Sequence, residues 1–363
     1  MSGAIVSCNA PYGEGGLGAV MAAAVEDERA RGTLDRYFCL APKAGDAAGQ
    51  AVDLRGYRWL TRGLLRFAGH GWRDFAACEI FDRAVAARLD RPARIVGFSA
   101  RALDTFRRGR RLGADALDLE APNSHVAHVR RQQDLAERAS PVERGWLTPF
   151  HVRKSLLEYD LADRIVVLSD YAWRTFVEAG VPESKLRRRV LPISPRFAPP
   201  ARPPAHDRFS VVYVGRLDVI KGLTILLDAF AAFDDPDAEL ILVGHPATDA
   251  MADWVDRRRR ADPRITLRPG DPLPALHRAD VLVHAAFEDG LALAPLEALA
   301  CGVPVIVSAD TGMKEFVTAG RNGFVVPTGD VDAIVDRLRW VRAHPLRGTF
   351  APPSLAPAHR VDL

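Results

Sequence analysis

The sequence predicts an α/β protein built from two doubly wound domains. Short apolar runs rich in Val and Ile recur along both halves of the chain, each followed by a turn and then by a segment with helical spacing. Continuous apolar strands that alternate with helices are typical of parallel sheets covered on both faces. A chain of 363 residues also exceeds the size of one ordinary domain.

The second half shows this alternation most clearly. Residues 210–214 form a β-branched run that ends at Gly215, and residues 223–231 have the apolar spacing of a helix. Further strands are predicted at 239–243, 265–267, 281–284 and 303–307, with a short helix at 294–300. In the first half we expect strands near 5–6, 95–98, 116–119 and 164–169, and helices at 17–30 and 171–179.

A proline-rich stretch separates the two halves. Prolines lack the amide donor and fix φ, so their density at positions 192–204 is typical of a connector. We therefore expect a first Rossmann-like domain over residues 1–192 and a linker over 193–207. The second domain is expected over 208–345, followed by an irregular Pro- and Ala-rich tail over 346–363.

Composition excludes several classes of protein. The formal net charge of +3 is too small to indicate nucleic-acid binding by itself. No apolar run approaches the roughly 20 residues that span a bilayer, and the first ten residues lack the pattern of a signal peptide. The four cysteines are scattered, which favours buried thiols in a reducing compartment over a zinc site or disulfides. We expect a cytoplasmic protein.

Three arginine-rich runs cover residues 107–111, 187–189 and 257–260. The simplest interpretation is a solvated helix face or loop. The first two runs could instead contact anionic lipid or a phosphorylated acceptor. Residues 59–67 have the spacing of an interfacial helix or of a core helix, so peripheral contact with the inner membrane face stays open.

Two cations flank the turn after the predicted strand at 210–214. Arg216 and Lys221 lie five residues apart, where the following helix begins and its first N–H groups have no partner within the helix. Such a helix start favours a dianion, and charge developing on a departing diphosphate would be stabilised there. Alternatively, the two side chains only cap or solvate the loop.

Two carboxylates follow the predicted strand at 281–284. Asp289 lies in the loop, and Glu297 lies in the short helix that follows. Ionised carboxylates are strong hydrogen-bond acceptors, which suits sugar hydroxyls. Taken singly, Asp289 could be a turn residue, and Glu297 could complement the helix dipole.

Two features of the first half are weaker signals. The glycine-rich turn at 12–18 permits close approach of a phosphate or sugar, but it fits neither the dinucleotide-binding nor the P-loop spacing. His125 and His128 have a spacing compatible with a metal, yet no third ligand is evident nearby. We expect no metal and favour one histidine bonded to a sugar or phosphate oxygen.

Four stretches together resemble the retaining glycosyltransferase family 4, the glycosyl transferases group 1, of GT-B fold. They are VGRLDVIKGLTILLDAF, ADVLVHAAFEDGLALAPLEALACGVPVIVS, GRNGFVVPTGD and, in the first half, LADRIVVLSDYAWRTFVEAGVPESKL. The resemblance runs almost end to end over residues 209–335. It implies two Rossmann-like domains facing across a cleft, the first on the acceptor side and the second binding a nucleotide sugar.

The resemblance implies a role for each matching residue. Arg216 and Lys221 would hold the donor diphosphate, Glu297 would contact the ribose, and His125 would face the donor sugar. Gly16 would approach the diphosphate from the first domain. His125, Arg216, Lys221 and Asp289 make up the implied catalytic set, and the donor site is completed by Gly215, Glu288, Gly290, Leu291, Ala292 and Leu293.

The implied reaction is hexosyl transfer from a UDP- or GDP-sugar to a polysaccharide or lipid-linked acceptor with retention of configuration. The acceptor would attack on the face that the diphosphate leaves, so no protein nucleophile, metal or cofactor is expected. Two other readings stay open: a sugar-nucleotide epimerase of the same architecture, and a truncated, non-catalytic nucleotide-sugar-binding paralogue.

The chain departs from the family pattern at three places. Asp289 stands where the acidic pair normally begins with glutamate, and Gly290-Leu291-Ala292 replaces a Gly-Phe-Gly segment. Residues 346–363 show no helical period, so the terminal helices that cross back to the first domain are not expected.

Overall fold

The computed structural model describes residues 3–54, 69–202 and 207–348, and these divide into two compact units. The first unit holds the residues up to 130 together with 146–191. The second holds residues 192 onward together with a short separate segment, 131–145. The chain therefore enters the second unit briefly, returns to the first, and enters the second again near residue 192.

The first unit contains a seven-stranded sheet in the order β3-β2-β1-β4-β5-β6-β7, and every neighbouring pair is parallel. Its strands are β1 Ala4–Ser7, β2 Leu34–Cys39, β3 Gly49–Ala51, β4 Arg94–Phe98, β5 Leu117–Ala121, β6 Arg164–Val167 and β7 Leu186–Arg188.

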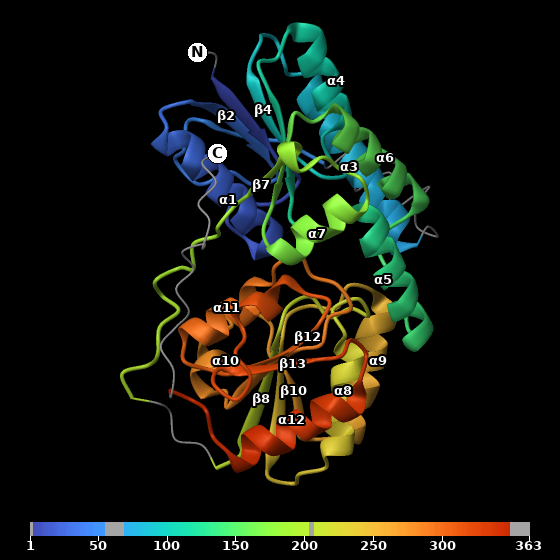
Figure 1. The fold of residues 1–363 in the computed structure, drawn as a ribbon, viewed down its shortest axis with the longest axis vertical. Coiled ribbons are helices and arrows are strands. Elements are labelled where there is room, and N and C mark those ends of the chain that lie inside the picture. The colour runs from blue at the N-terminus through green and yellow to red at the C-terminus, as the bar shows by residue number, and fades with distance from the viewer. Residues whose placement is uncertain (1–2, 55–68, 203–206, 349–363) are drawn as a thin grey trace. The chain divides into compact units, whose positions relative to one another are not determined.

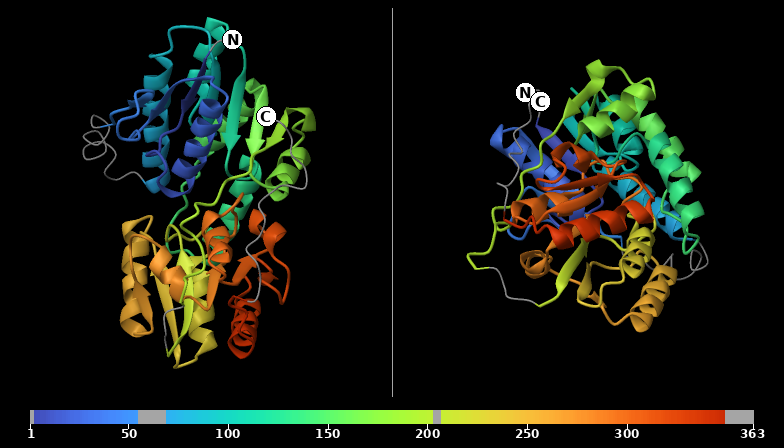
Figure 2. Two further views of the ribbon diagram at one scale, coloured as in Figure 1. Left: turned by 90° about the vertical axis from the view of Figure 1, so that its left-hand side faces the viewer. Right: turned by 60° about the horizontal axis from the view of Figure 1, so that its bottom comes forward.

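Helices cover both faces of this sheet (Figures 1 and 2). Helices α3, α4 and α6 pack against one another, whereas α1 packs on β1 and β2, away from that layer (Figure 1). Right-handed crossovers in opposite directions from β1 and β4 require this separation. The helices are α1 Gly15–Ala30, α3 His70–Ala86, α4 Leu103–Leu112, α6 Pro149–Leu161 and α7 Asp170–Glu178, and α5 Val126–Ala139 begins in this unit and continues into the second from Arg131.

The second unit contains a six-stranded parallel sheet in the order β10-β9-β8-β11-β12-β13. Its strands are β8 Phe209–Val214, β9 Ala238–Val243, β10 Ile265–Leu267, β11 Val281–His284, β12 Val305–Ser308 and β13 Gly323–Val326. Its helices are α8 Leu223–Phe233, α9 Asp249–Ala261, α10 Leu273–Arg278, α11 Leu293–Ala300 and α12 Val331–Ala343. Both sheets confirm the predicted α/β class.

The helix predicted at 223–231 is present as α8, but it is not a surface helix with one solvated face. Of its first eight residues, 223–230, all are buried except Asp228, which is partly exposed, because α12 packs against α8. The carboxyl-terminal segment of the second unit thus covers the face that an isolated βαβ unit would leave in water.

The order of strands defines where loops gather. In each sheet the direction of winding reverses between two central strands, β1 and β4 in the first unit and β8 and β11 in the second. Ligands of doubly wound sheets bind beyond the carboxyl ends of the strands at such a reversal. In the second unit this position brings together the loop at 215–222, after β8, and the loop at 285–292, after β11.

The structure corrects the interpretation of the basic run at 187–189. Arg189 is buried, with a bidentate ion pair to Glu120 at 2.6 and 3.1 Å and a further pair to Asp27. Arg188 pairs with Asp170 at 2.5 Å. These charges therefore hold the first unit together and do not form a solvated basic face.

The run at 107–111 is likewise engaged locally. Arg110 pairs with Asp163 at 2.5 Å, and Arg108 donates to the carbonyl of Leu89 at 3.3 Å.

The segment 59–67 and the tail beyond residue 348 lie outside the described residues. Across the described ranges, no helix has the length and apolar character needed to cross a bilayer. All four cysteines are buried and unpaired, as predicted.

Candidate functional site

The loop after β8 is shaped by close backbone packing. Gly215 has φ +149°, and a methyl group on neighbouring Gly244 would overlap the carbonyl of Gly215. Leu217 then pairs with the next loop, donating to the carbonyl of His245 and accepting from the amide of Ala247, both at 2.9 Å. Two loops at the carboxyl edge of the sheet are therefore held side by side.

Asp218 organises both candidate cations within this loop. Its carboxylate is buried and accepts from Nε of Arg216 at 2.5 Å and from the backbone amide of Lys221 at 2.8 Å. The hydroxyl of Tyr213 donates to the carbonyl of Arg216 at 2.7 Å. The guanidinium of Arg216 remains about half exposed, with a side-chain exposure of 45%. An anion approaching this edge can reach it.

Gly222 brings the loop of β8 against the loop of β11. It has φ +69°, and a methyl group there would overlap the backbone carbonyl of Ala285. The amide of Phe287 donates to the carbonyl of Ile220 at 2.8 Å. The backbones of the two loops are thus in direct contact, which fixes the distance between the side chains they carry.

Lys221 and Asp289 form an ion pair across these loops. Nζ of Lys221 lies 2.7 Å from Oδ2 of Asp289, and Nε2 of His284 lies 3.2 Å from the same oxygen. Burial alone would raise the pKa of Asp289, but Lys221 and His284 hold it well below its ordinary value. Burial would lower the pKa of Lys221, yet the carboxylates of Asp289 and Glu288 raise it. Both groups are charged near neutral pH.

The residues around Asp289 are buried and held by the loop after β12. The amide of Gly312 donates to the carbonyl of Asp289 at 2.9 Å. The side chains of Leu291 and Ala292 are 8 and 7% exposed, so the positions that replace Gly-Phe-Gly are packed inward. Glu288 and Gly290 are buried as well, and Leu293 is the first residue of α11.

Glu297 lies in the second turn of α11, as its fifth residue, and not in the first turn. Interaction with the helix dipole falls off beyond the first turn, so that explanation for this carboxylate no longer applies. Burial raises the pKa of Glu297 to about 7, with Arg196 lowering it and Asp271 raising it. Arg196 and Asp271 are themselves paired at 3.1 Å.

In the first unit, Gly16 is the second residue of α1 and is exposed. Among the described residues, leaving out its chain neighbours and the backbone of its own helix, no atom lies within 4 Å of a Cβ atom built there. The first-turn amides of α1 are therefore open to an anion. Gly18 is different, because a methyl group on it would overlap the carbonyl of Pro11. One glycine leaves space for a ligand and the other permits packing.

His125 is buried and immediately precedes α5. Its ring packs against both Tyr159 and Phe176, at centroid distances of 5.1 and 5.2 Å. The amide of Ala127 donates to Nδ1 of His125 at 3.3 Å, so the neutral ring carries its proton on Nε2. His128, three residues on, bonds instead to the hydroxyl of Tyr171 at 2.8 Å.

The sequence patterns did not indicate a further polar cluster in the first unit. Asp74, Cys78 and His151 offer potential ligand atoms that all lie within 4.8 Å of one another. However, the backbone amide of Thr148 donates to Nδ1 of His151 at 3.1 Å, which leaves the ring proton on Nε2, 3.2 Å from Asp74. In this arrangement the histidine stabilises Asp74 and has no lone pair directed at a cation.

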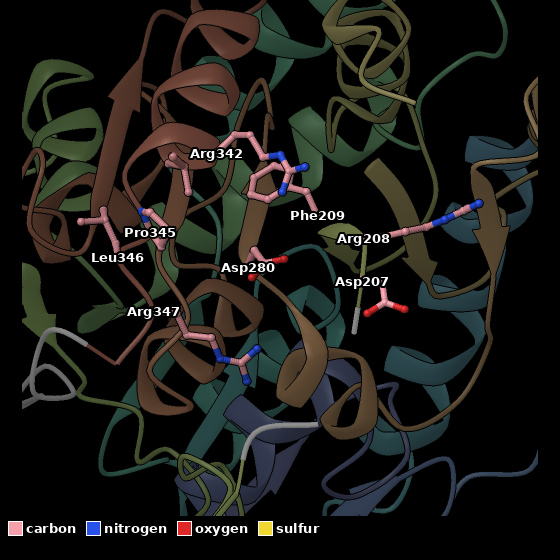
Figure 3. Close-up of a pocket in the computed structure, with 9 residues that line it drawn as sticks. Asp207, Arg208, Phe209, Asp280, Arg342, Pro345, Leu346 and Arg347 are labelled. Atoms are coloured by element: carbon pink, nitrogen blue, oxygen red, sulfur yellow. The ribbon is translucent and has the colours of Figure 1, made fainter. Parts of the chain in front are cut away.

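A cavity of about 180 Å³ lies at the opposite edge of the second sheet, where strands β8 and β11 begin. Phe209, Asp280, Arg342 and Arg347 are among its lining residues (Figure 3). Arg347 donates to the carbonyl of Ala279 at 2.7 Å and to that of His277. The arginines here hold the carboxyl-terminal segment, and the cavity is not part of the site built by Lys221 and Asp289.

The geometry of the second unit coincides with a family match. Residues 208–344 match the model of the glycosyl transferases group 1. This part of the chain is therefore similar to that family. The match covers the sheet, both loops of the candidate site and α12, whereas the first unit lies outside it.

Curated proteins that resemble this chain in sequence are also named as sugar transferases. The chain is 32% identical over 208 residues to a GDP-mannose-dependent alpha-(1-6)-phosphatidylinositol monomannoside mannosyltransferase of Mycolicibacterium smegmatis, covering 51% of this chain and 54% of that protein. It is 29% identical over 151 residues to the capsular polysaccharide biosynthesis glycosyltransferase CapM of Staphylococcus aureus, with 40% of each chain covered. The aligned part thus spans about half or less of these curated relatives.

Solved structures show the same GT-B fold over nearly the whole chain. Sucrose-phosphate synthase from Thermosynechococcus elongatus superposes with a TM-score of 0.69 at 20% identity, covering 96% of this chain and 92% of the other. Anabaena HepE in complex with UDP and glucose superposes with a TM-score of 0.66 at 14% identity, covering 95 and 90%. The two doubly wound units confirm the fold that the sequence predicted.

Proposed function

We propose that the protein is a retaining glycosyltransferase that moves a hexose from a nucleoside diphosphate donor to a polysaccharide or lipid-linked acceptor. One observation carries the proposal: Arg216 and the Lys221–Asp289 pair lie together at the winding reversal of the second sheet. Two cations suited to a diphosphate thus lie beside a carboxylate suited to sugar hydroxyls. The group 1 family match over the same residues supports it.

The donor's charge is taken up by protein cations in this proposal. The half-exposed guanidinium of Arg216 suits bidentate contact with phosphate oxygens, and the ammonium of Lys221 adds a point charge. As the glycosidic bond breaks, the leaving diphosphate gains negative charge that both groups stabilise. The donor is the substrate, and no metal or resident cofactor has a role in this scheme. A chelator is accordingly expected to leave turnover unchanged.

The choice of UDP or GDP, and of the sugar, is part of the proposal and rests on relatives. The mycobacterial relative is named as GDP-mannose-dependent, and the HepE structure contains UDP and glucose. Glu297, with its raised pKa, is assigned to the ribose hydroxyls, and His125 to the transferred sugar. Gly16 and the open first turn of α1 are assigned to the diphosphate.

The test is a panel of UDP-, GDP- and ADP-sugars offered with lipid-linked and oligosaccharide acceptors. We expect release of nucleoside diphosphate together with a new glycosidic bond, and NMR of the product should show the donor's anomeric configuration. If the donor sugar is isomerised and not transferred, the protein is a sugar-nucleotide epimerase and the proposal is wrong. Saturable donor binding without turnover would support a non-catalytic protein.

A further inference from the structure

Residues 131–145, which comprise the later part of α5 and the turn after it, belong to the second unit, although residues up to 130 and residues 146–191 belong to the first. Residues 131–145 have their own hydrogen-bonded turn. Glu137 accepts from the amide of Gly145 at 2.9 Å and pairs with Arg144 at 2.8 Å. The turn presents the side chain of Glu143, which is only 9% exposed, to the loop after β8.

Glu143 uses both carboxylate oxygens within the second unit. Oε1 accepts from the backbone amide of Val219 at 3.1 Å, and Oε2 accepts from the hydroxyl of Thr248. Thr248 is also the N-cap of α9, accepting from the amide of Met251 at 3.1 Å. Val219 is 1% exposed, so water does not replace Glu143 as a partner for its amide.

The position of Val219 connects this contact to the candidate diphosphate site. Val219 directly follows Asp218, whose carboxylate holds both the side chain of Arg216 and the backbone of Lys221. A rotation of the peptide at 218–219 would therefore move Asp218 and both cations with it. Glu143 is the contact that opposes this rotation from outside the loop.

We infer that Glu143 is a positioning residue for the diphosphate-binding loop. It lies in residues 131–145, the short stretch of the second unit between two parts of the first. The inference rests on the proposed function, because it concerns the loop assigned to the donor. Glu143 acts on the loop through the backbone of Val219, which directly follows Asp218.

The experiment compares Glu143→Ala and Glu143→Gln with Arg144→Ala as the matched control. Arg144 neighbours Glu143, but its side chain is 88% exposed and pairs with Glu137. Affinities for UDP, GDP and ADP are measured by calorimetry, and donor KM and kcat in the transfer assay. Hydrogen exchange of peptides covering residues 215–223 reports the loop without any ligand.

Glu143→Ala is expected to weaken nucleoside diphosphate binding and to raise donor KM about tenfold, because a buried amide loses its partner. Exchange of the loop amides should quicken. Glu143→Gln should stay within about threefold of the wild type, since its carbonyl oxygen still accepts from Val219 and its amide group can face the Thr248 oxygen. The control should match the wild type. In a Lys221→Ala/Arg216→Ala background the effect of Glu143→Ala on affinity should vanish.

A purely structural role gives a different pattern. It would lower the amount of active enzyme and leave both KM and the nucleotide dissociation constant unchanged. Wild-type constants and exchange rates in folded Glu143→Ala would overturn the inference. Should that variant not fold, Glu143→Asp, too short to span both partners, is measured instead. If the wild type binds none of the three nucleotides, the proposed function fails, and loop exchange alone then decides the role of Glu143.

Discussion

Nζ of Lys221 lies 2.7 Å from Oδ2 of Asp289, across two loops that are 68 residues apart in the chain. The pair joins the loop assigned to the donor diphosphate to the loop assigned to the donor sugar. Because Nε2 of His284 lies 3.2 Å from the same carboxylate oxygen, Asp289 keeps a second polar neighbour when Lys221 turns toward a phosphate. The two loops can therefore respond to one ligand together.

The first prediction concerns Lys221. Lys221→Ala should reduce turnover by ~10² or more, because it removes a cation that stabilises the leaving diphosphate. The substitution also leaves a buried carboxylate without its main partner, so a loss of stability is expected alongside. Steady-state kinetics with the active donor measure the first effect, and urea unfolding the second.

Lys185→Ala is the control for charge removal, since Lys185 lies in the first unit and donates only to the carbonyls of Tyr159 and Asp160. Turnover of Lys221→Ala equal to that of the control would remove Lys221 from the mechanism. The double variant Lys221→Ala/Asp289→Asn separates the two effects. It should recover stability without recovering turnover.

A second prediction follows from the raised pKa of Glu297, which is about 7. The ionised carboxylate is the better acceptor for ribose hydroxyls, so donor affinity should fall as pH falls through 7. Between pH 8 and pH 6 the ionised fraction drops roughly tenfold, and donor KM should rise in proportion. Glu297→Gln should show a donor KM that is high and nearly independent of pH.

The control for this measurement is Glu183→Gln, an exposed position in the first unit. It should reproduce the wild-type dependence of KM on pH. A wild-type KM that stays constant from pH 6 to pH 8 would contradict the assignment of Glu297 to the donor.

A third prediction concerns the stability of the first unit. Glu158 is buried and accepts from the amides of Ala100 and Ala102, at 2.5 and 2.8 Å. Burial raises its pKa to about 8, with Lys154 lowering it. An acid whose pKa is higher in the folded state stabilises the fold below its unfolded pKa. That contribution is lost as pH rises through the folded value.

The unfolding free energy should therefore decline between pH 6 and pH 9 in the wild type and more gently in Glu158→Gln. The variant lacks the titrating group and also loses one acceptor. Its unfolding free energy should therefore lie furthest below that of the wild type at pH 6, and this difference should become smaller toward pH 9. Urea titrations of the whole chain at each pH give the comparison. Glu178→Gln, an exposed position on α7, should parallel the wild type; parallel curves for Glu158→Gln as well would refute the pKa argument.

Much of the fold could be predicted because the buried strands are recognisable in the sequence as apolar runs. β8, β9, β11 and β12 are continuous apolar runs, and a central parallel strand needs such a run on both faces. β2 begins Leu-Asp-Arg, and β7 is Leu-Arg-Arg. Neither has an apolar run long enough to predict a strand. β7 and β3 lie at the sheet edges, where pairing on one side only relaxes the demand for apolar residues.

The sequence predicts a set of candidate site residues but not how they are arranged. Arg216, Lys221 and Asp289 were singled out because each lies in a loop after the carboxyl end of a strand, and Glu297 because it lies in the helix that follows the second loop. The pairing of Lys221 with Asp289 depends on β8 lying beside β11, and the order of strands cannot be read from hydrophobic periodicity. Likewise, Glu143 belongs to a polar turn whose sequence resembles any exposed loop. Its burial follows only from the path of residues 131–145.

The last prediction separates the two reasons for a glycine at position 222. Gly222 has φ +69° and also packs against the carbonyl of Ala285, whereas Gly320 has φ +72° with no atom within 4 Å of a built side chain. Gly320→Ala therefore measures the cost of left-handed backbone alone, about 1 kcal/mol. Gly222→Ala carries that cost and the overlap with Ala285 as well, so it should lower the unfolding free energy by more than Gly320→Ala does.

Because the overlap pushes apart the two loops that carry Lys221 and Asp289, donor KM should rise in Gly222→Ala and remain at the wild-type value in Gly320→Ala. Equal stability losses in the two variants would show that the loops can separate without cost, and the contact between them would then not be what sets the geometry of the ion pair.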